Sequence, residues 1–419
     1  MKKLVLFDFD GTVIDNSEGI FNCIKYALDK TGTPYPDDNI LRRFVGPALN
    51  YSYCKYIKDD KEAAERFVAD YRERYAPTGH TECAPYPGIR ETLEKLNADG
   101  IICAVCSGKP YMFVEKIVKL LGMEQLFSGL FCPGFGNRSS DKSELILEAA
   151  EHFGVPKEDI LMVGDTVFDI RSAKTAGVDS MGVAYGFSEP GELNAEGAEY
   201  SADSPAMIYN EITSKRPCVI FGAGEYGPDV PAVPENAFVI AADGGYQKCR
   251  ENGIVPDMLI GDLDSFTGEL SDYDGTLIKL PTEKDVTDTY AAVTEALKNG
   301  CRSFVFYGCT GGRPDHTFAN VSLLKRLSLD GIRARMFGNG YVFTAVTNGT
   351  LFLPAREKGY ISVFSLSEKS TGVYEKGTRY LLDDAVLTDT FPLGVSNEFT
   401  GSDVYITVKN GTLLVTYEN

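Results

Sequence analysis

The sequence of 419 residues has no tryptophan, only three histidines and few basic residues for its size. Its 41 lysines and arginines stand against 60 aspartates and glutamates, a net charge of -19, which argues against a nucleic-acid partner because phosphate backbones bind basic surfaces. No apolar run approaches the roughly 20 residues that cross a bilayer, so we expect no membrane partner. The sequence also lacks the Gly-x-x-x-x-Gly-Lys-Ser/Thr loop that holds phosphates in many nucleotide-binding proteins.

The ten cysteines show no spacing typical of a disulfide framework. A strand-like run starts almost at the first residue, so we expect no signal peptide, reduced thiols and a cytoplasmic location. Cys103 and Cys106 have the spacing of a redox pair, but they lie in an apolar, strand-like run where successive side chains face opposite sides of a sheet. We therefore interpret them as structural thiols.

Length and patterning predict an α/β protein of two or three domains. Short apolar runs typical of buried parallel strands alternate with helical segments over residues 1–212, and again over residues 216–340. The first region is expected to be a doubly wound parallel sheet with an all-helical insert over about residues 16–85, and the second another α/β domain. Over residues 341–419, β-rich runs separated by Gly and Pro predict a small antiparallel β-sandwich.

A first set of candidate site residues lies at strand ends and helix starts of residues 1–212. Its members are Asp8, Asp10, Ser107, Lys142, Asp165 and Asp169. Ligands of doubly wound sheets bind beyond the carboxyl ends of the strands, so these residues should converge. A carboxylate such as Asp8 can attack phosphorus, and Asp10 can protonate the leaving alkoxide and then activate water. Ser107 and Lys142 could hold the transferred oxygens, and Asp165 with Asp169 would complete an oxygen shell for Mg²⁺.

Residues 1–212 resemble the haloacid dehalogenase superfamily of phosphatases, in particular its phosphoglycolate phosphatase and nucleotidase branch. The resemblance rests on Asp8-Phe9-Asp10-Gly11-Thr12, on Ser107 and Lys142, and on Gly164-Asp165-Thr166-Val167-Phe168-Asp169. It implies that Asp8 is the nucleophile that forms an aspartyl phosphate and that Asp10 is the acid and base. It also implies that Asp8, Asp10, Asp165 and Asp169 hold Mg²⁺.

The helical insert would, by the same resemblance, be a cap that closes over the substrate and sets its identity. Tyr51, Tyr53 and Tyr56 form an aromatic cluster in this insert. They either line the substrate pocket or pack the core of the cap, and the sequence leaves both readings open.

A second set of acidic residues lies at the ends of the predicted strands of residues 216–340 or in the loops after them. It comprises Asp243, Asp257, Asp262, Asp264, Asp285 and Asp288. In extended backbone Asp262 and Asp264 lie on one side, and such a pair can bind Mg²⁺ without a basic phosphate loop. Asp285 and Asp288 are three residues apart at the start of a predicted helix, whose N-terminus favours anions. Lys284 and Arg313 are candidate phosphate clamps.

These residues belong to the motifs Ala242-Asp243-Gly244-Gly245, Pro256-Asp257, Gly261-Asp262-Leu263-Asp264-Ser265, Glu283-Lys284-Asp285-Val286-Thr287-Asp288 and Gly311-Gly312-Arg313-Pro314-Asp315-His316, which Asn320 and Ser396-Asn397 follow. The motifs resemble those of thiamine pyrophosphokinase, and the resemblance covers residues 216–419. The resemblance implies a homodimer that transfers diphosphate from ATP to thiamine and releases AMP. Asp262, Asp264 and Asp288 would hold Mg²⁺ and serve catalysis. The residues implied to contact ATP or thiamine are Asp243, Gly244, Lys284, Asp285, Thr287, Gly312, Arg313, Asp315, His316, Asn320, Ser396 and Asn397.

The chain departs from that family in two places. Gly377-Thr378-Arg379-Tyr380 stands where the family often has Gly-Leu-Lys-Tyr, and without tryptophan any aromatic contact to thiamine must come from Tyr or Phe. Arg313 and Asp315 could form a simple loop ion pair, but their place in the motif favours a ligand role. For His316 we favour a structural hydrogen bond over a catalytic base, on a helix face that it could share with Asn320.

Two phosphate chemistries in one chain suggest that the first half prepares a substrate for the second. The hypothesis is that a Mg²⁺-dependent phosphomonoesterase removes phosphate from thiamine monophosphate and that the kinase uses the free thiamine. The alternatives are a general nucleotidase or phosphoglycolate-type phosphatase, a first half that is a non-catalytic regulatory module, and a second half that senses nucleotide without turnover.

Overall fold

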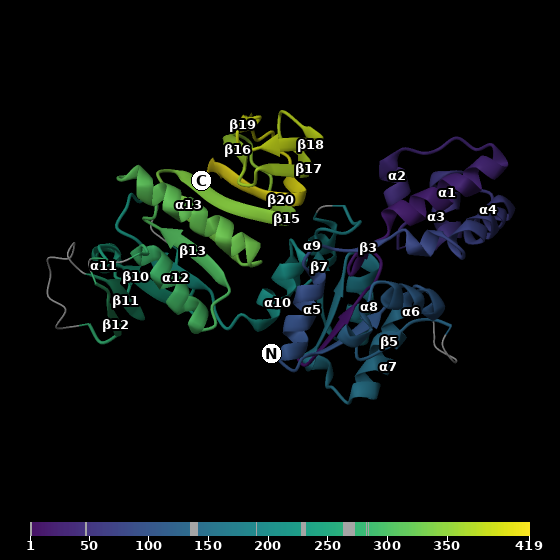
Figure 1. Cartoon of the computed structure of the whole chain (residues 1–419), viewed down its shortest axis with the longest axis horizontal. Coiled ribbons are helices and arrows are strands. Elements are labelled where there is room, and N and C mark those ends of the chain that lie inside the picture. Colours follow the sequence, from purple (N-terminus) through teal and green to yellow (C-terminus); the bar gives the residue numbers. More distant parts are fainter. Residues whose placement is uncertain are drawn as a thin grey trace. The chain divides into compact units, whose positions relative to one another are not determined.

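The computed structural model describes residues 2–46, 48–134, 141–189, 191–227, 232–262, 273–281, 283 and 285–419. The chain forms two compact units, Met1–Tyr209 and Asn210–Asn419 (Figure 1). Among the described residues, no helix combines the length and the apolar character that a membrane span requires.

The first unit is built on a six-stranded parallel sheet in the order β5-β4-β1-β6-β7-β8. The strands are β1 (Leu4–Phe7), β4 (Ile102–Cys106), β5 (Leu130–Phe131), β6 (Ile160–Gly164), β7 (Asp179–Val183) and β8 (Tyr200–Ala202). The helices are α5 (Ile89–Ala98), α6 (Tyr111–Leu120), η2 (Glu124–Leu126), α7 (Lys142–Phe153), η3 (Lys157–Asp159), α8 (Val167–Ala176), α9 (Glu192–Glu196) and α10 (Pro205–Thr213). The predicted doubly wound parallel sheet is confirmed.

The order of the strands fixes where a ligand can bind. From β1 the chain moves outward through β4 and β5 on one side, and through β6, β7 and β8 on the other. The strand order therefore reverses between β1 and β6, and the carboxyl ends of these two neighbouring strands meet at a topological switch point. Asp8 and Asp165 are the residues that directly follow the two strands.

The predicted helical insert consists of α1 (Ser17–Thr31), α2 (Asp38–Arg42), α3 (Leu49–Tyr56) and α4 (Lys61–Tyr75), which Figure 1 shows as one group. The short antiparallel pair β2 (Ile14–Asp15) and β3 (Ala84–Pro85), the latter preceded by η1 (Gly79–Thr81), connects it to the sheet. Tyr53 is buried with its ring 4.9 Å from that of Phe67, and Tyr56 packs against the same core, whereas Tyr51 is exposed. Core packing is therefore the role of two of the three tyrosines.

The second unit begins with a parallel sheet in the order β12-β11-β10-β9-β13-β14. The strands are β9 (Cys218–Phe221), β10 (Phe238–Ala242), β11 (Met258–Gly261), β12 (Thr276–Lys279), β13 (Ser303–Tyr307) and β14 (Arg333–Gly338). The helices are α11 (Gly245–Glu251), α12 (Asp288–Lys298) and α13 (Pro314–Leu329). Here the order reverses between β9 and β13, which pair in parallel and form the second switch point.

Antiparallel strands complete the second unit, as predicted, but they continue the parallel sheet instead of standing apart from it. They are β15 (Tyr341–Leu353), β16 (Tyr360–Ser365), β17 (Lys369–Lys376), β18 (Leu382–Thr388), β19 (Gly394–Glu398) and β20 (Val404–Glu418). β14 and β15 form a hairpin around Asn339 and Gly340, which have φ values of 51° and 78°. Long β15 and β20 pair along their length, and β16 and β17 pair with different halves of β20. A separate apolar cluster fills the resulting layers.

Candidate active sites

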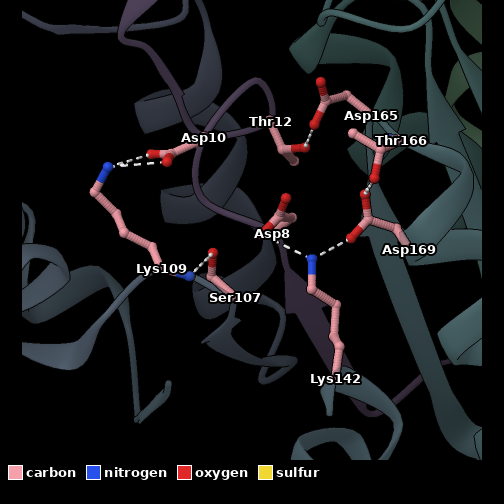
Figure 2. Close-up of polar contacts among 9 residues, drawn as sticks. All are labelled: Asp8, Asp10, Thr12, Ser107, Lys109, Lys142, Asp165, Thr166 and Asp169. Atoms are coloured by element: carbon pink, nitrogen blue, oxygen red, sulfur yellow. Dashed lines mark hydrogen bonds and ion pairs between the residues drawn. The ribbon is translucent and has the colours of Figure 1, made fainter. Parts of the chain in front are cut away.

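The carboxylate of Asp8 lies at the centre of the first site (Figure 2). Its backbone N–H donates to Val163 O at 2.8 Å, which fixes the end of β1 against β6. Lys142, the first residue of α7, places its Nζ 3.1 Å from Asp8 Oδ1 and also donates to Asp169. Burial raises the pKa of Asp8 to about 6, although the nearby ammonium of Lys142 opposes the rise.

Asp165 and Asp169 are both fully buried and are oriented by hydrogen bonds. Asp165 accepts from Thr12 Oγ1 at 3.1 Å and from the backbone N–H of Phe187 at 2.9 Å. Asp169 accepts from the backbone N–H and the hydroxyl of Thr166 at 2.9 and 2.7 Å, in a capping box that opens α8. Burial, followed by the negative charges of Asp169 and Asp8, raises the pKa of Asp165 far above its ordinary value.

Three of the four predicted metal ligands come together. Oxygens of Asp8, Asp165 and Asp169 all lie within 4.8 Å of one another, and all three residues are buried. Asp10 lies outside this group, because both of its carboxylate oxygens accept from Lys109 Nζ at 2.9 Å (Figure 2). The metal-binding role of these aspartates, and the acid and base role of Asp10, stay predictions.

Ser107, after β4, is 3% exposed and accepts from the backbone N–H of Lys109 at 3.3 Å. Its hydroxyl also hydrogen-bonds Asp8, which favours the ionised carboxylate. Sequence reasoning missed Lys109, Thr12 and Thr166 as site residues, although Thr12 and Thr166 lie within motifs that it identified and Lys109 lies two residues after Ser107. It also missed the loop of Phe187 after β7, for which the only signal is its position at a strand end.

Gly11 explains why the opening motif requires a glycine. It has a φ of +83°, and a Cβ atom there would lie 2.1 Å from Asp165 Oδ2. The loop after β1 therefore passes so close to the carboxylate that only glycine fits.

In the second unit, two glycine-containing loops meet at the switch point between β9 and β13. The backbone N–H groups of Gly222 and Gly224 donate to Tyr307 O and Gly308 O at 2.8 and 2.7 Å. Glu225 then accepts from the backbone N–H of Gly312 at 3.1 Å, which shapes the predicted nucleotide-binding loop. Sequence reasoning missed the loop of residues 222–225, whose signal was a Gly-x-Gly directly after a strand.

Asp243 and Asp262 directly follow β10 and β11, neighbours in the sheet. Asp243 has a φ of 47°, unusual for a residue with a side chain, and its Oδ1 is buried with no hydrogen-bond partner among the described residues. Gly244 stands at the N-cap of α11. Asp257, by contrast, precedes β11 and accepts from the backbone N–H of Val239 at 2.8 Å, so it lies at the opposite strand ends. It therefore lies at a strand end, but away from the carboxyl ends that Asp243 and Asp262 follow.

The remaining acidic residues surround the start of α12. Thr287 is the N-cap residue, and its hydroxyl accepts from the backbone N–H of Tyr290 at 3.2 Å. Asp288 is half-buried at the first helical position, and Asp285 is exposed. Asp264 and Lys284 lie outside the described residues. Within the part of the chain that is described, the only close group of three potential metal ligands is the one in the first unit, so the second metal site stays a prediction.

The start of α13 presents Arg313, Asp315 and His316 on the surface. Arg313 and Asp315 form an ion pair of 2.5 Å between exposed side chains, the loop pair that the sequence left open. His316 is exposed, and in the described regions its ring makes no hydrogen bond, so the expected structural hydrogen bond is not seen. Asn320 is buried and donates to Cys309 O at 2.7 Å, so it ties α13 to the loop after β13.

Ser396 and Asn397 on β19 have different surroundings. Ser396 is exposed with a φ of 60°. Asn397 is buried, and its Nδ2 donates to Glu375, Thr378 and the carbonyl of Tyr380 at 2.7, 3.0 and 2.6 Å. Its Oδ1 accepts from the backbone N–H of Tyr380 at 2.9 Å. The amide of Asn397 therefore holds the loop that departs from the family pattern.

Comparison with known proteins identifies three family domains. Residues 5–183 match the haloacid dehalogenase-like hydrolase model. Residues 232–336 match the thiamin pyrophosphokinase catalytic domain, and residues 350–413 match the thiamin pyrophosphokinase vitamin B1 binding domain.

Curated relatives match the first half over nearly their whole length. A 5'-nucleotidase of Pseudomonas aeruginosa is 34% identical over 48% of this chain and 92% of that protein. An N-acetylmuramic acid 6-phosphate phosphatase of the same species is 30% identical over 50% of this chain and 94% of that protein. Among solved structures, thiamine pyrophosphokinase from Bacillus subtilis is 26% identical over 48% of this chain and 98% of that chain, with a TM-score of 0.45.

Proposed function

Because the chain belongs to the haloacid dehalogenase-like hydrolases through its first half and to the thiamin pyrophosphokinases through its second, we propose that it is a bifunctional enzyme. The first unit hydrolyses a phosphomonoester, and the second transfers diphosphate from ATP to thiamine with release of AMP. The observation that carries the first activity is the buried group of Asp8, Asp165 and Asp169, in which Asp8 and Asp169 pair with the ammonium of Lys142. We place the enzyme in the cytoplasm, where ATP is available.

In the first unit Asp8 is the nucleophile, held toward the switch point by its bond to Val163. Its attack on phosphorus forms an aspartyl phosphate and breaks the bond to the ester oxygen. Asp10 gives a proton to the departing alkoxide and then takes one from the water that hydrolyses the intermediate. Lys142 and Ser107 lie beside Asp8 and balance the charge of the transferred oxygens.

The residues of this site fit Mg²⁺. Three buried carboxylates supply hard oxygen donors, and Asp8 Oδ1 is buried with no hydrogen bond, apart from the ion pair with Lys142. Asp8, Asp165 and Asp169 would surround the ion. When bound, Mg²⁺ would offset the negative charge that these aspartates share with the substrate.

In the second unit, Asp262, Asp264 and Asp288 would hold Mg²⁺ for the phosphates of ATP. The buried, unbonded Oδ1 of Asp243 at the neighbouring strand end supports a ligand there, since an isolated buried carboxylate oxygen is costly. No side-chain nucleophile is required, because positioning and charge neutralisation can supply the acceleration. Exposed Tyr380, beside Asn397, replaces tryptophan as the candidate aromatic contact for thiamine.

Five exposed apolar side chains support the proposed homodimer. Tyr380, Leu381, Phe391, Leu393 and Val395 around β19 are 60%, 66%, 65%, 48% and 43% exposed. Exposed apolar side chains that gather on one surface are typical of an interface, and a second copy of this chain is the partner that we propose. Phe391→Lys should shift the sedimenting species from dimer to monomer and raise the KM for thiamine without affecting phosphomonoester hydrolysis. An unchanged dimer would refute this interface.

Thiamine monophosphate is the proposed substrate of the first unit, because its hydrolysis supplies the free thiamine that the second unit consumes. The similarity to a 5'-nucleotidase favours a second candidate, a nucleoside monophosphate. AMP is the product of the proposed kinase reaction, so a nucleotidase in the same chain would remove that product. With thiamine monophosphate as substrate the phosphatase acts before the kinase step, and with AMP as substrate it acts after that step.

The test uses the full-length protein with Mg²⁺, ATP and thiamine monophosphate, with thiamine species, AMP and adenosine followed by chromatography. Thiamine diphosphate should form, and Asp8→Asn should stop its formation from thiamine monophosphate but not from free thiamine. If thiamine monophosphate is not used, but adenosine forms from the AMP released when free thiamine is supplied instead, the nucleotidase alternative is supported. If Asp8→Asn cleaved phosphomonoesters as fast as the unaltered protein, the assignment of the nucleophile would fail.

A further inference from the structure

The ring of Tyr75 lies beside the ammonium of Lys109, which binds the proposed acid and base residue Asp10, and its hydroxyl bonds to nothing that the structure describes. Tyr75 ends α4 of the insert and is 6% exposed, yet its hydroxyl oxygen is buried with no hydrogen-bond partner among the described residues. Lys109 Nζ, which binds both oxygens of Asp10, lies 5.1 Å from the centroid of the Tyr75 ring. The phenol is therefore placed where the insert meets the sheet.

A buried hydroxyl without a partner is unfavourable, since water is lost and no hydrogen bond replaces it. The hydroxyl is not free to turn elsewhere. The Tyr75 ring stacks on Tyr71 at 5.3 Å and meets the edge of Phe113 at 5.1 Å, and its backbone carbonyl lies 3.2 Å from His80 Nδ1. A phenylalanine would make the same ring contacts without the unbonded hydroxyl. The place of the ring beside Lys109, which binds Asp10, therefore indicates a ligand that completes the hydrogen bond.

We propose that the Tyr75 hydroxyl donates a hydrogen bond to the leaving group of the phosphomonoester, the alcohol portion that Asp10 protonates. This inference rests on the proposed phosphatase function of the first unit and adds a specificity-determining residue to it. The alcohol must carry an uncharged acceptor, such as a ring oxygen, a hydroxyl or a ring nitrogen. Thiamine and nucleosides both meet this requirement.

The charges where the insert meets the sheet favour a leaving group whose acceptor is uncharged. Lys109 is already bound by both oxygens of Asp10, so it has little positive charge to offer an anionic leaving group. Burial, and then the negative charge of Asp10, raises the pKa of Tyr75 far above its ordinary value, so the phenol stays protonated and can donate. A leaving group with a carboxylate, as in phosphoglycolate, finds no compensation from these groups.

The experiment compares the full-length protein with its Tyr75→Phe variant, using phosphate release with Mg²⁺ from four substrates. Thiamine monophosphate and AMP offer an uncharged acceptor, phosphoglycolate offers a carboxylate, and phenyl phosphate has no second polar atom. We expect the variant to lose about tenfold in kcat/KM on thiamine monophosphate or AMP, whichever is cleaved, as for one lost hydrogen bond. The loss on phenyl phosphate should stay below about twofold.

Tyr71→Phe is the matched control, because Tyr71 belongs to the same stacked pair but its hydroxyl is not left buried and unbonded. It should leave the preference among substrates unchanged. The urea midpoint of Tyr75→Phe should equal or exceed that of the unaltered protein, since no bond within the protein is lost; a lower midpoint would show a structural role and overturn the proposal.

An equal loss on phenyl phosphate, no loss on any substrate, or a preference for phosphoglycolate would also overturn the role of Tyr75 while leaving the phosphatase function intact. If the unaltered protein released phosphate from none of the four, the proposed function would fail as well. The rates at which the unaltered protein cleaves thiamine monophosphate and AMP then show which of the two supplies the acceptor.

Discussion

Replacing Lys142 by methionine removes the cation that lies among the buried carboxylates of the first site. The Lys142 side chain is 13% exposed, with Nζ 3.1 Å from Asp8 Oδ1 and a further bond to Asp169, whose side chain is fully buried. Breaking a buried ion pair by removing one partner costs about 3–5 kcal/mol, because the remaining charge is left uncompensated. We expect the first unit to lose about that free energy of unfolding at about pH 8 without Mg²⁺.

The deficit should shrink as the pH falls. Burial already raises the pKa of Asp8 to about 6, and loss of the Lys142 ammonium, which opposes that rise, would raise the pKa further. Protonation then removes the uncompensated charge, so the variant and the unaltered protein should approach each other at about pH 5. Mg²⁺ should also reduce the deficit, since it supplies positive charge at the same carboxylates.

Hydrogen exchange of peptides from β1 and β6, measured across urea concentrations, isolates the first unit within the full-length protein. Two control variants define the cause. Lys142→Arg keeps the charge and should retain most of the stability, and Lys142→Met combined with Asp169→Asn should cost less than the sum of the two single changes. A deficit of equal size at about pH 5 and about pH 8 would show that packing, not charge, is lost and would refute the reasoning.

Without Mg²⁺ the first unit should lose roughly 3 kcal/mol of stability as the pH rises from about 4 to about 6, because the pKa of Asp8 is raised to about 6 in the folded protein from an ordinary 3.8. Urea titrations with and without Mg²⁺ measure this loss. A rise in stability over the same pH range would contradict the prediction. Gly11→Ala should abolish phosphomonoester hydrolysis, since its Cβ would lie 2.1 Å from Asp165 Oδ2. Its control is Gly32→Ala, with a φ of +65° and nothing within 4 Å, which should cost only about 1–2 kcal/mol and keep the activity; similar activities would show that contact with Asp165 is unimportant. Glu375→Gln should stabilise the second unit by roughly 3 kcal/mol at about pH 9 and hardly at all at about pH 5, because burial raises the pKa of Glu375 to about 7. Hydrogen exchange of β17 peptides at both pH values tests this, and an equal effect at each would contradict the titration.

The first site could be predicted because a parallel sheet forces distant residues together. Asp8, Ser107 and Asp165 follow β1, β4 and β6, which are neighbours in the sheet. Asp257 shows what such a position leaves open, because a residue at a strand end can lie at either end of the strand. Asp257 precedes β11 and binds backbone at the start of β10, so its carboxylate lies at the edge away from the ligand.

The junction near residue 340 shows what pattern reading does not register. A change from alternating helices and strands to β-rich segments near residue 340 predicted a separate sandwich. The sequence pattern shows that the local structure changes near this point, but it does not show whether the sheet ends there. Asn339-Gly340 is a two-residue turn of the kind that joins adjacent antiparallel strands. The turn residues themselves contained the information that the hydrogen-bonded sheet continues from β14 into β15.

A motif identifies residues, but it does not show which of their atoms are available to a ligand. The resemblance gave Ser396 and Asn397 the same role in binding thiamine, and in the structure they differ. The two donor hydrogens of the Asn397 amide are shared among three acceptors, and its Oδ1 accepts from Tyr380 and Glu398. A thiamine contact through that amide would have to break bonds that shape the loop before β18. The exposed Ser396, held in a rare backbone conformation, and the Tyr380 ring that Asn397 positions are therefore the better candidates for direct contact, with Asn397 acting through them.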